Sequence, residues 1–191
     1  MKYSIIKNFL NDVELKESLE FHSKVFYKQD KIYEILSNQI KDYYIFDSIQ
    51  EKIKILLHEN TNLSFYFSKL WIGYNTHTNT NNTELPFIPH FDKIRHLKGM
   101  VYLNDVTLDN GPIHISHHEY EWIEKLRLNL PSDYKKLGLN SQPLSEIEKL
   151  KPIVGEKNTL ILFDTNTPHN AGKVMQNEFR KFLRFDYVVD I

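Results

Sequence analysis

The feature of this sequence that most restricts its fold is a series of short apolar and aromatic segments, separated by turn residues, in its second part. Strand candidates lie at residues 63–74, 87–92, 97–104, 112–116, 159–163, 169–174 and 179–189. Asp109-Asn110-Gly111 and Gly155-Glu156 supply turn signals between them. Many short strands without intervening helices favour a sandwich or a jelly roll.

Helical patterns are concentrated before this series. Residues 2–6 form a strand candidate, and Asn11 with Glu14 then gives a capping box that opens an amphipathic helix ending near Phe26. Two further helices are expected at residues 32–40 and 48–57, and the latter carries apolar residues at helical spacing for packing on a sheet. We therefore expect one mainly β domain with flanking helices over residues 1–191, in which residues 1–60 support a β core formed by residues 61–191.

Two segments interrupt the strands. The Asn- and Thr-rich run within residues 75–88 cannot build a core of its own and predicts a loop. Residues 119–150 predict a helical insertion that contains the breakers Pro131, Gly138 and Pro143. Because both segments flank the strands that carry the candidate site described below, we expect them to form a lid over it.

The composition excludes several classes of protein. No cysteine is present, which excludes disulfide scaffolds, thiolate zinc sites and cysteine nucleophiles and requires nitrogen and oxygen ligands for any metal. The formal net charge of −1 gives no basic excess for nucleic acid, and no apolar stretch reaches the length of a signal peptide or a membrane span. We expect a cytoplasmic protein without nucleic-acid or membrane partners, and the sequence leaves its oligomeric state open.

A candidate metal site begins with His90 and Asp92, which lie two residues apart on a predicted strand. Their side chains therefore project from the same face and can share one ion. A surface pair at a strand end is the alternative, because this spacing also arises by chance. Downstream, a turn, an apolar strand and a polar loop over residues 155–168 lead to His169 at the start of another strand, and Arg180 follows in an otherwise apolar strand.

In this order the motifs resemble the Fe(II)- and 2-oxoglutarate-dependent oxygenase superfamily, between its prolyl-hydroxylase-like and phytanoyl-CoA-hydroxylase-like branches. The resemblance covers residues 70–187 and is carried by His90-Phe91-Asp92, by Met100-Val101-Tyr102-Leu103-Asn104, by Asn110-Gly111-Pro112, and by His169 and Arg180. The chain departs from the second branch at residues 113–118, where Ile-His-Ile-Ser-His-His replaces Pro-Gly-Ser-His. It departs again at Phe182, where a small or hydroxyl residue is often found.

The resemblance implies a double-stranded β-helix, the jelly roll of cupin-like proteins, with Fe(II) bound by His90, Asp92 and His169. It also implies 2-oxoglutarate as co-substrate and O₂ as oxidant. Two imidazoles and one carboxylate on one face of the iron leave three positions for these molecules. Arg180 would bind the C5 carboxylate of 2-oxoglutarate through its planar guanidinium, with Arg184 as the alternative.

The resemblance suggests further residues around the site. Tyr102 and Tyr74 are candidates for the co-substrate pocket, although Tyr102 could equally be a plain core tyrosine. Candidate substrate-lining residues are Asn75, Asn104, His114 and Arg184. For His114, His117 and His118 we favour exposed or substrate-lining roles over a second metal site.

The expected reaction is the hydroxylation, or another oxidation, of a C–H bond in a small-molecule substrate, with release of succinate and CO₂. Halogenation is disfavoured, because halogenases of the superfamily replace the aspartate at the position of Asp92 by a small residue. Two alternatives remain open. One is a peptide or protein hydroxylase of the same superfamily, and the other is a jelly-roll binding module without catalysis.

Overall fold

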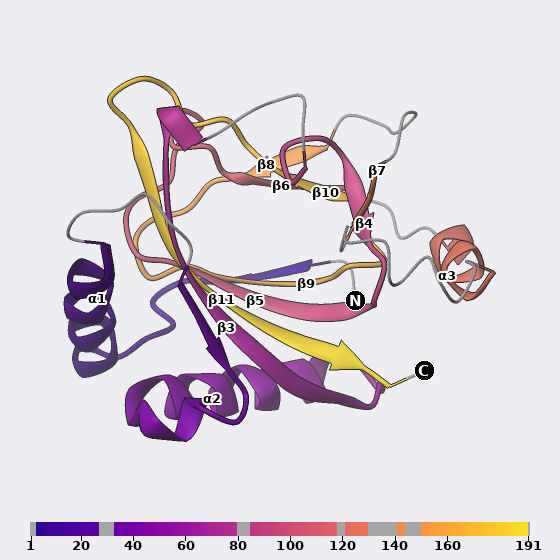
Figure 1. Ribbon diagram of the computed structural model, residues 1–191, viewed down its shortest axis with the longest axis horizontal. Helices are drawn as coiled ribbons and strands as arrows, with labels where there is room; N and C mark the ends of the chain where they lie inside the picture. Colours follow the sequence, from indigo (N-terminus) through magenta and orange to yellow (C-terminus); the bar gives the residue numbers. More distant parts are fainter. Residues whose placement is uncertain are drawn as a thin grey trace.

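Two antiparallel sheets face each other in the computed structural model, which describes residues 3–26, 33–79, 85–117, 121–129, 141–143 and 150–190 (Figure 1). The strands are β1 (Tyr3–Ile6), β2 (Tyr33–Leu36), β3 (Phe65–Thr76), β4 (His90–Asp92), β5 (His96–Tyr102), β6 (Ile113–Ile115), β7 (Ser141–Pro143), β8 (Lys151–Ile153), β9 (Leu160–Asp164), β10 (His169–Ala171) and β11 (Phe179–Val189). The larger sheet has the order β1-β9-β5-β11-β3-β2, and the smaller has the order β7-β4-β10-β6-β8. Successive strands from β3 to β6 and from β8 to β11 alternate between the sheets, which confirms the predicted jelly roll.

Three α-helices flank the sheets: α1 (Asp12–Phe26), α2 (Tyr44–Asn60) and α3 (Glu121–Leu128). Short 3₁₀ helices span Ile40–Asp42 and His77–Asn79. The predicted capping box opens α1, because the Glu14 amide donates to Asn11 Oδ1 and the Asn11 amide donates to Glu14 Oε2, both at 2.9 Å. Helices α1 and α2 lie outside the larger sheet, whereas α3 lies at the other end of the molecule beside β4 (Figure 1). None of the described helices is long and apolar enough to span a membrane.

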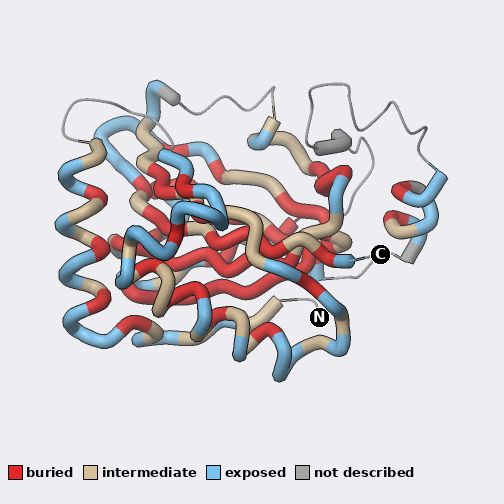
Figure 2. The backbone as a smooth tube through the Cα atoms, turned by 60° about the horizontal axis from the view of Figure 1, so that its bottom comes forward, coloured by how far each residue is buried: buried red, intermediate tan, exposed pale blue. Residues whose placement is uncertain are grey.

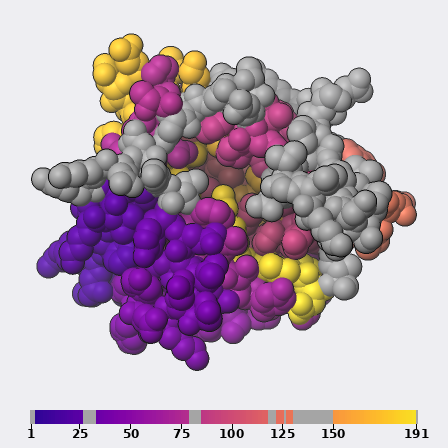
Figure 3. Space-filling view, in the orientation of Figure 1, coloured from indigo at the N-terminus to yellow at the C-terminus, as the bar shows by residue number. Residues whose placement is uncertain are grey.

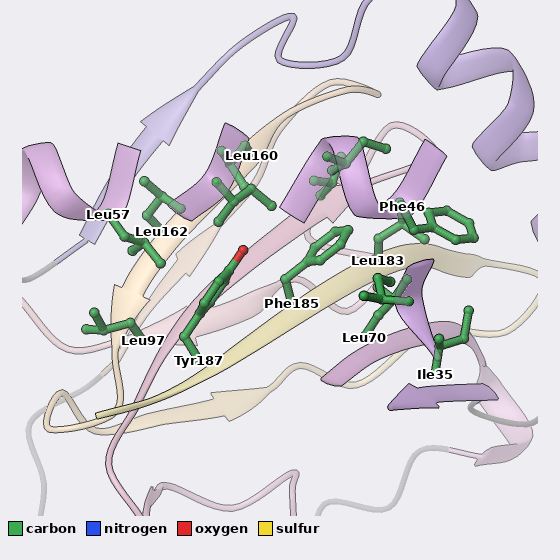
Figure 4. Packing of buried hydrophobic residues seen from close by; sticks show 14 of the residues in the cluster. Ile35, Phe46, Leu57, Leu70, Leu97, Leu160, Leu162, Leu183, Phe185 and Tyr187 are labelled. Carbon is green, nitrogen blue, oxygen red and sulfur yellow. The ribbon is translucent and has the colours of Figure 1, made fainter. Parts of the chain in front are cut away.

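The main hydrophobic core lies between α2 and the outer face of the larger sheet. Phe46, Ile49, Ile53 and Leu57 of α2 are completely buried against leucines and aromatic residues of the strands (Figure 4). A Cβ atom on Gly99 would lie 2.8 Å from Ile53 Cγ2, so the helix packs directly on the backbone of β5. Buried residues run along the central strands, while the outward sides of the helices are exposed (Figure 2). This core supports the sheet without using its inner face.

A second, smaller core fills part of the space between the two sheets. It joins side chains of the larger sheet to isoleucines of β6 and β8, and its members are Met100, Tyr102, Val106, Ile113, Ile115, Ile153, Ile161, Phe163 and Phe182. The Tyr102 hydroxyl donates to the Ile153 carbonyl at 2.9 Å and accepts from the Ile113 amide at 3.2 Å. Tyr102 therefore ties the two sheets together, and the remaining inner surface is free to carry polar groups.

The expected helix at residues 32–40 is wrong, because this segment contains the edge strand β2. Its apolar residues fit helical spacing, but the chain pairs with β3 from Tyr33 opposite Ile72 to Leu36 opposite Lys69. Pairing with an existing strand buries Ile35 and overrides the local periodicity. Helix α2 begins at Tyr44, earlier than expected, and β4 is shorter than expected. Residues 80–84 of the predicted loop, and residues 118–120, 130–140 and 144–149 in and beside the predicted insertion, lie outside the described residues.

The docking of α1 on β3 predicts a pH-dependent stability. His22 Nε2 lies 3.0 Å from the Gly73 carbonyl, which can only accept, so this nitrogen carries the proton. Burial lowers the pKa of His22 to about 4, from its ordinary 6.5. Between these two values the unfolded chain binds a proton that the folded chain does not, so stability falls as pH falls, by about 1.4 kcal/mol per pH unit from this group.

His22→Gln keeps an N–H donor for Gly73 and removes the titration. We expect urea unfolding at pH 7, 6 and 5 to show a shallower loss of stability for this variant than for the wild type. Parallel losses for the two proteins would show that His22 is not the neutral buried imidazole described here.

Candidate active site

Three potential metal ligands meet on the inner side of the smaller sheet. Strands β4 and β10 pair with His169 opposite His90, and residues opposite each other in an antiparallel pair project from the same face. The two imidazole centroids are 4.5 Å apart. Asp92, two residues after His90, shares that face, and the ligand atoms of all three residues lie within 4.8 Å of one another. All three side chains are buried. The structure therefore brings together, in one buried cluster, the three residues predicted from the sequence.

Backbone carbonyls fix both histidines in the state that binds a metal. His90 Nδ1 lies 2.8 Å from the Ile88 carbonyl and His169 Nδ1 lies 3.0 Å from the Thr167 carbonyl, so each Nδ1 carries the proton. Each Nε2 then presents a lone pair toward Asp92 Oδ1, at 4.0 Å from His90 and 3.6 Å from His169. Burial lowers the pKa of both imidazoles, which keeps them neutral at pH 7.

Asp92 is held from two sides. Its Oδ2 lies 2.5 Å from Lys98 Nζ and 3.6 Å from His96 Nδ1. Burial alone would raise the pKa of Asp92, but Lys98, His96 and His169 together bring it well below the ordinary value. The guanidinium of Arg127 in α3 donates to the Asp92 main-chain carbonyl through Nε at 3.2 Å and Nη2 at 3.0 Å. The carboxylate is thus ionised and oriented, with Oδ1 toward the two imidazoles.

Arg180 is a buried cation on the inner face of the larger sheet. It projects from β11 opposite Asn75 of β3, is 2% exposed, and lies over the Phe182 ring at 5.3 Å. One Nη1 hydrogen bond goes to the Gly111 carbonyl, whereas the buried Nε has no hydrogen-bond partner. Among the described residues no carboxylate forms an ion pair with it. A buried guanidinium without an acidic partner is costly unless a ligand supplies the acceptor.

A second arginine lies four residues further along the same face. Arg184 forms a two-point ion pair with Asp186, from Nε to Oδ1 at 2.9 Å and from Nη2 to Oδ2 at 3.0 Å. The Trp71 indole also donates to Asp186 Oδ2, at 2.9 Å. The two arginines therefore differ, because Arg184 has a carboxylate partner, whereas Arg180 has none within the residues that the structure describes.

The structure places three of the expected residues in contacts with other parts of the chain. The hydroxyl proton of Tyr102 is donated to the Ile153 carbonyl, within the second hydrophobic core. Tyr74 lies opposite Lys181 in the sheet, not opposite Arg180, and its ring packs on His22 of α1, on the outer face. The amide of Asn104 is occupied by main-chain groups, since Oδ1 accepts from Lys181 and Nδ2 donates to Phe179 and Asp105.

His114 and Asn75 keep positions close to Arg180. A Cβ atom on Gly172 would lie 2.8 Å from His114 Cε1 and 2.9 Å from the carbonyl carbon of Gly111, whose oxygen accepts from Arg180. Burial lowers the pKa of His114, and the charge of Arg180 lowers it further. Asn75 faces the same side of the larger sheet as Arg180. His117 is exposed and His118 lies outside the described residues. Within the described part of the chain, His90, Asp92 and His169 form the single group of three that could hold a metal.

Sequence reasoning missed Lys98, Asp186, Trp71 and Arg127. Alternation along β5 could have found Lys98, because it shares a face with Met100 and Tyr102 in a strand that is otherwise apolar apart from its first residue. Asp186 likewise stands among apolar residues of β11. Their partners could not be found in this way, since Lys98 reaches Asp92 across the gap between two sheets.

The buried pair of Lys98 and Asp92 predicts a specific effect of metal on stability. Lys98→Met leaves a buried carboxylate without its closest cation, so the metal-free variant should lose about 3 kcal/mol or more of unfolding free energy in urea with EDTA. Because a divalent ion replaces the missing charge, Zn(II) should stabilise this variant more than the wild type.

Lys69→Met is the matched control, since Lys69 forms a more exposed ion pair with Glu34, at 2.9 Å. It should cost at most about 1 kcal/mol and leave the Zn(II) effect unchanged. Equal losses for the two variants would contradict a special role for Lys98.

Comparison with known proteins finds the likeness in structure and not in sequence. No protein-family model and no curated protein matches the chain. Among solved structures, the non-heme alpha ketoglutarate dependent epimerase SnoN from nogalamycin biosynthesis is similar with a TM-score of 0.68 and 15% identity, over 98% of this chain and 78% of SnoN. HygX from Streptomyces hygroscopicus, with nickel and 2-oxoglutarate bound, is similar with a TM-score of 0.63 and 12% identity, over 98% of this chain and 82% of HygX.

The viral collagen prolyl hydroxylase vCPH from Paramecium Bursaria Chlorella virus-1, in its 2OG complex, gives a TM-score of 0.58 and 15% identity, over 100% of this chain and 97% of that one. SnoN is an epimerase and vCPH is a prolyl hydroxylase, and all three structures are similar to this chain over at least 98% of its length. At such identities the likeness establishes the fold. The chain has the double-stranded β-helix fold of the Fe(II)- and 2-oxoglutarate-dependent oxygenases.

Proposed function

We propose that this protein is a non-haem Fe(II)- and 2-oxoglutarate-dependent oxygenase that oxidises a C–H bond of a small molecule and releases succinate and CO₂. One observation carries the proposal. A buried His-Asp-His donor set with both imidazoles in the metal-binding tautomer lies between two sheets. Their interior also holds a guanidinium that has no acidic partner in the described part of the chain. A metal ion would bind the donor set, and a dicarboxylate would supply the acidic partner of the guanidinium.

The donor set fits Fe(II). Nε2 of His90, Nε2 of His169 and Oδ1 of Asp92 would hold the ion from one side, and two imidazoles with one carboxylate are the ligand set that non-haem Fe(II) oxygenases use. Lys98 keeps the second carboxylate oxygen engaged, so Asp92 offers one oxygen to the metal. When bound, Fe(II) supplies the activation of O₂ that side chains alone lack.

The surroundings of Arg180 fit the far carboxylate of 2-oxoglutarate. The guanidinium is fixed by the Gly111 carbonyl and by the Phe182 ring, and its buried Nε is available to an acceptor. A carboxylate there would be bound by charge-assisted hydrogen bonds in a site from which water is excluded. The neighbouring apolar residues of β6, β8 and β9 would keep the co-substrate chain dry.

Similar proteins support a small-molecule substrate. SnoN has been crystallised with Fe3+, alpha ketoglutarate and nogalamycin RO, and HygX with nickel, 2-oxoglutarate and hygromycin B. Because SnoN is an epimerase, we propose the oxidation of a C–H bond without naming the final product, which experiment will identify.

The direct test of this function is the consumption of 2-oxoglutarate. Purified protein with Fe(II), ascorbate, O₂ and 2-oxoglutarate should form succinate even without substrate, by slow uncoupled turnover. His169→Ala should abolish succinate formation and weaken Co(II) binding, measured anaerobically by titration calorimetry, by about 100-fold or more, because one of three ligands is lost. The variant should keep the wild-type circular dichroism spectrum, since the outer core does not involve His169. Wild-type Co(II) affinity in the variant would refute the metal site.

The role of Arg180 predicts a separable defect. A buried charge-assisted contact contributes about 1.5–3 kcal/mol, and an orphaned carboxylate adds a desolvation cost, so Arg180→Ala should raise the Kd for 2-oxoglutarate about 10- to 1000-fold. Co(II) binding should stay unchanged, because the arginine is not a ligand. Arg184→Ala is the matched variant on the same strand, about 13 Å away, and should retain 2-oxoglutarate affinity. The reverse pattern would assign the co-substrate to Arg184.

A further inference from the structure

The ion pair of Arg184 and Asp186 leaves one edge of the guanidinium unused. Asp186 takes Nε and one N–H of Nη2, so both N–H groups of Nη1 and the second N–H of Nη2 point away from the carboxylate. No described residue accepts a hydrogen bond from Nη1. The free edge is the one that binds a carboxylate or a phosphate through two parallel hydrogen bonds.

This edge is held in a fixed orientation. Asp186 is 3% exposed and is itself fixed by the Trp71 indole, at 2.9 Å. The Arg184 guanidinium lies 5.1 Å from the centre of the Trp71 ring. The Arg184 side chain is 24% exposed, whereas that of Asp186 is 5% exposed, so the arginine extends from a buried anchor toward open space. A guanidinium fixed in this way loses little conformational freedom on binding a ligand.

The free edge belongs to the same inner face as Lys98, which contacts Asp92. Arg184 is opposite Met100 on β5, and Asp186 is opposite Lys98, the partner of Asp92. Burial lowers the pKa of His90 most, and the charges of Lys98 and Arg184 lower it further, so Arg184 is within electrostatic reach of that ligand. The face between the two sheets is hollowed, and atoms of the C-terminal strand are visible inside the hollow (Figure 3).

The charges of the inner faces favour an anion there. With a divalent metal and 2-oxoglutarate bound, the metal, Lys98, Arg180 and Arg184 carry one positive charge more than Asp92, Asp186 and the co-substrate carry negative. A substrate with a single anionic group would balance this excess in a site of low dielectric constant.

We propose that Arg184, anchored by Asp186 and Trp71, binds a carboxylate or phosphate group of the primary substrate and so directs its C–H bond toward the metal. The proposal rests on the proposed oxygenase function and adds a substrate class, small organic anions. Arg180 binds the co-substrate 2-oxoglutarate, and Arg184 binds the substrate that is oxidised. Carboxylate, which is planar, and phosphate, which is tetrahedral, are both oxyanions that this guanidinium edge can bind. The experiment below distinguishes between them.

The test uses protein with Zn(II) and 2-oxoglutarate bound, so that no turnover occurs. Trp122→Phe leaves Trp71 as the one tryptophan, and its fluorescence reports on the guanidinium beside its ring. Inorganic phosphate, acetate and the neutral isostere acetamide are titrated separately at low ionic strength. We expect a saturable response to phosphate or acetate and none to acetamide, and the anion that saturates at lower concentration identifies the group.

Two variants decide the assignment. Arg184→Gln should weaken the anion response at least tenfold while the Kd for 2-oxoglutarate changes less than threefold. Lys69→Gln removes the other cation over the Trp71 ring, 4.8 Å from its centre, and should keep the response. A wild-type protein without a saturable response, or one that Arg184→Gln leaves intact, overturns the proposal.

The outcomes also separate this proposal from the function on which it rests. Loss of 2-oxoglutarate binding in Arg184→Gln would overturn the substrate assignment, because Arg184 would then hold the co-substrate, and the oxygenase would stand. If the wild type bound neither Zn(II) nor 2-oxoglutarate, the proposed function would fail. The anion titration of the metal-free protein, with and without Arg184, would still decide whether the arginine edge binds oxyanions.

Discussion

The antiparallel register that sets His169 opposite His90 is the constraint on which the candidate site depends. A slip of one residue would turn one imidazole to the other face of the sheet and destroy the cluster. Strands β4 and β10 are only three residues long, so their own pairing cannot fix the register. Neighbouring contacts do so: the Asn170 side chain donates through Nδ2 to the Phe87 carbonyl, the Ala171 main-chain amide donates to the Pro86 carbonyl, and Arg127 donates to the Asp92 carbonyl. The last contact joins the insertion helix α3 to β4, the strand that carries His90 and Asp92.

The two faces of the larger sheet have different roles: the outer face packs the main hydrophobic core, and the inner face carries the charged side chains. The outer face buries leucine and aromatic side chains under α2 and supplies most of the hydrophobic stabilisation. The inner face can therefore carry Lys98, Arg180 and Asp186, whose burial costs free energy unless each charge finds a partner. Lys98 and Asp186 have partners within the chain, whereas Arg180 lacks an acidic one among the described residues. That difference makes Arg180 the candidate for binding an acidic ligand.

Local signals in the sequence predicted the elements that depend on local chemistry. The capping box of Asn11 and Glu14 located the start of α1, and the bounds expected for the last strand agree with β11. The ligand cluster was predicted because alternation places His90 and Asp92 on one face and the resemblance supplied His169. Features that depend on contacts with distant parts of the chain were not predicted from the sequence. Residues 32–40 joined a sheet edge, Tyr74 pointed to the outer face because of its register with β11, and Lys98 met Asp92 across two sheets.

The central claim is that one interior binds a divalent metal at the His-Asp-His cluster and a dicarboxylate at Arg180. A crystal structure of the protein grown anaerobically with Mn(II) and 2-oxoglutarate tests it most directly. The account predicts Mn(II) bound by Nε2 of His90, Oδ1 of Asp92 and Nε2 of His169, with the far carboxylate of 2-oxoglutarate on the guanidinium of Arg180. A metal bound by other residues, or a co-substrate whose carboxylate lies away from Arg180, would contradict it.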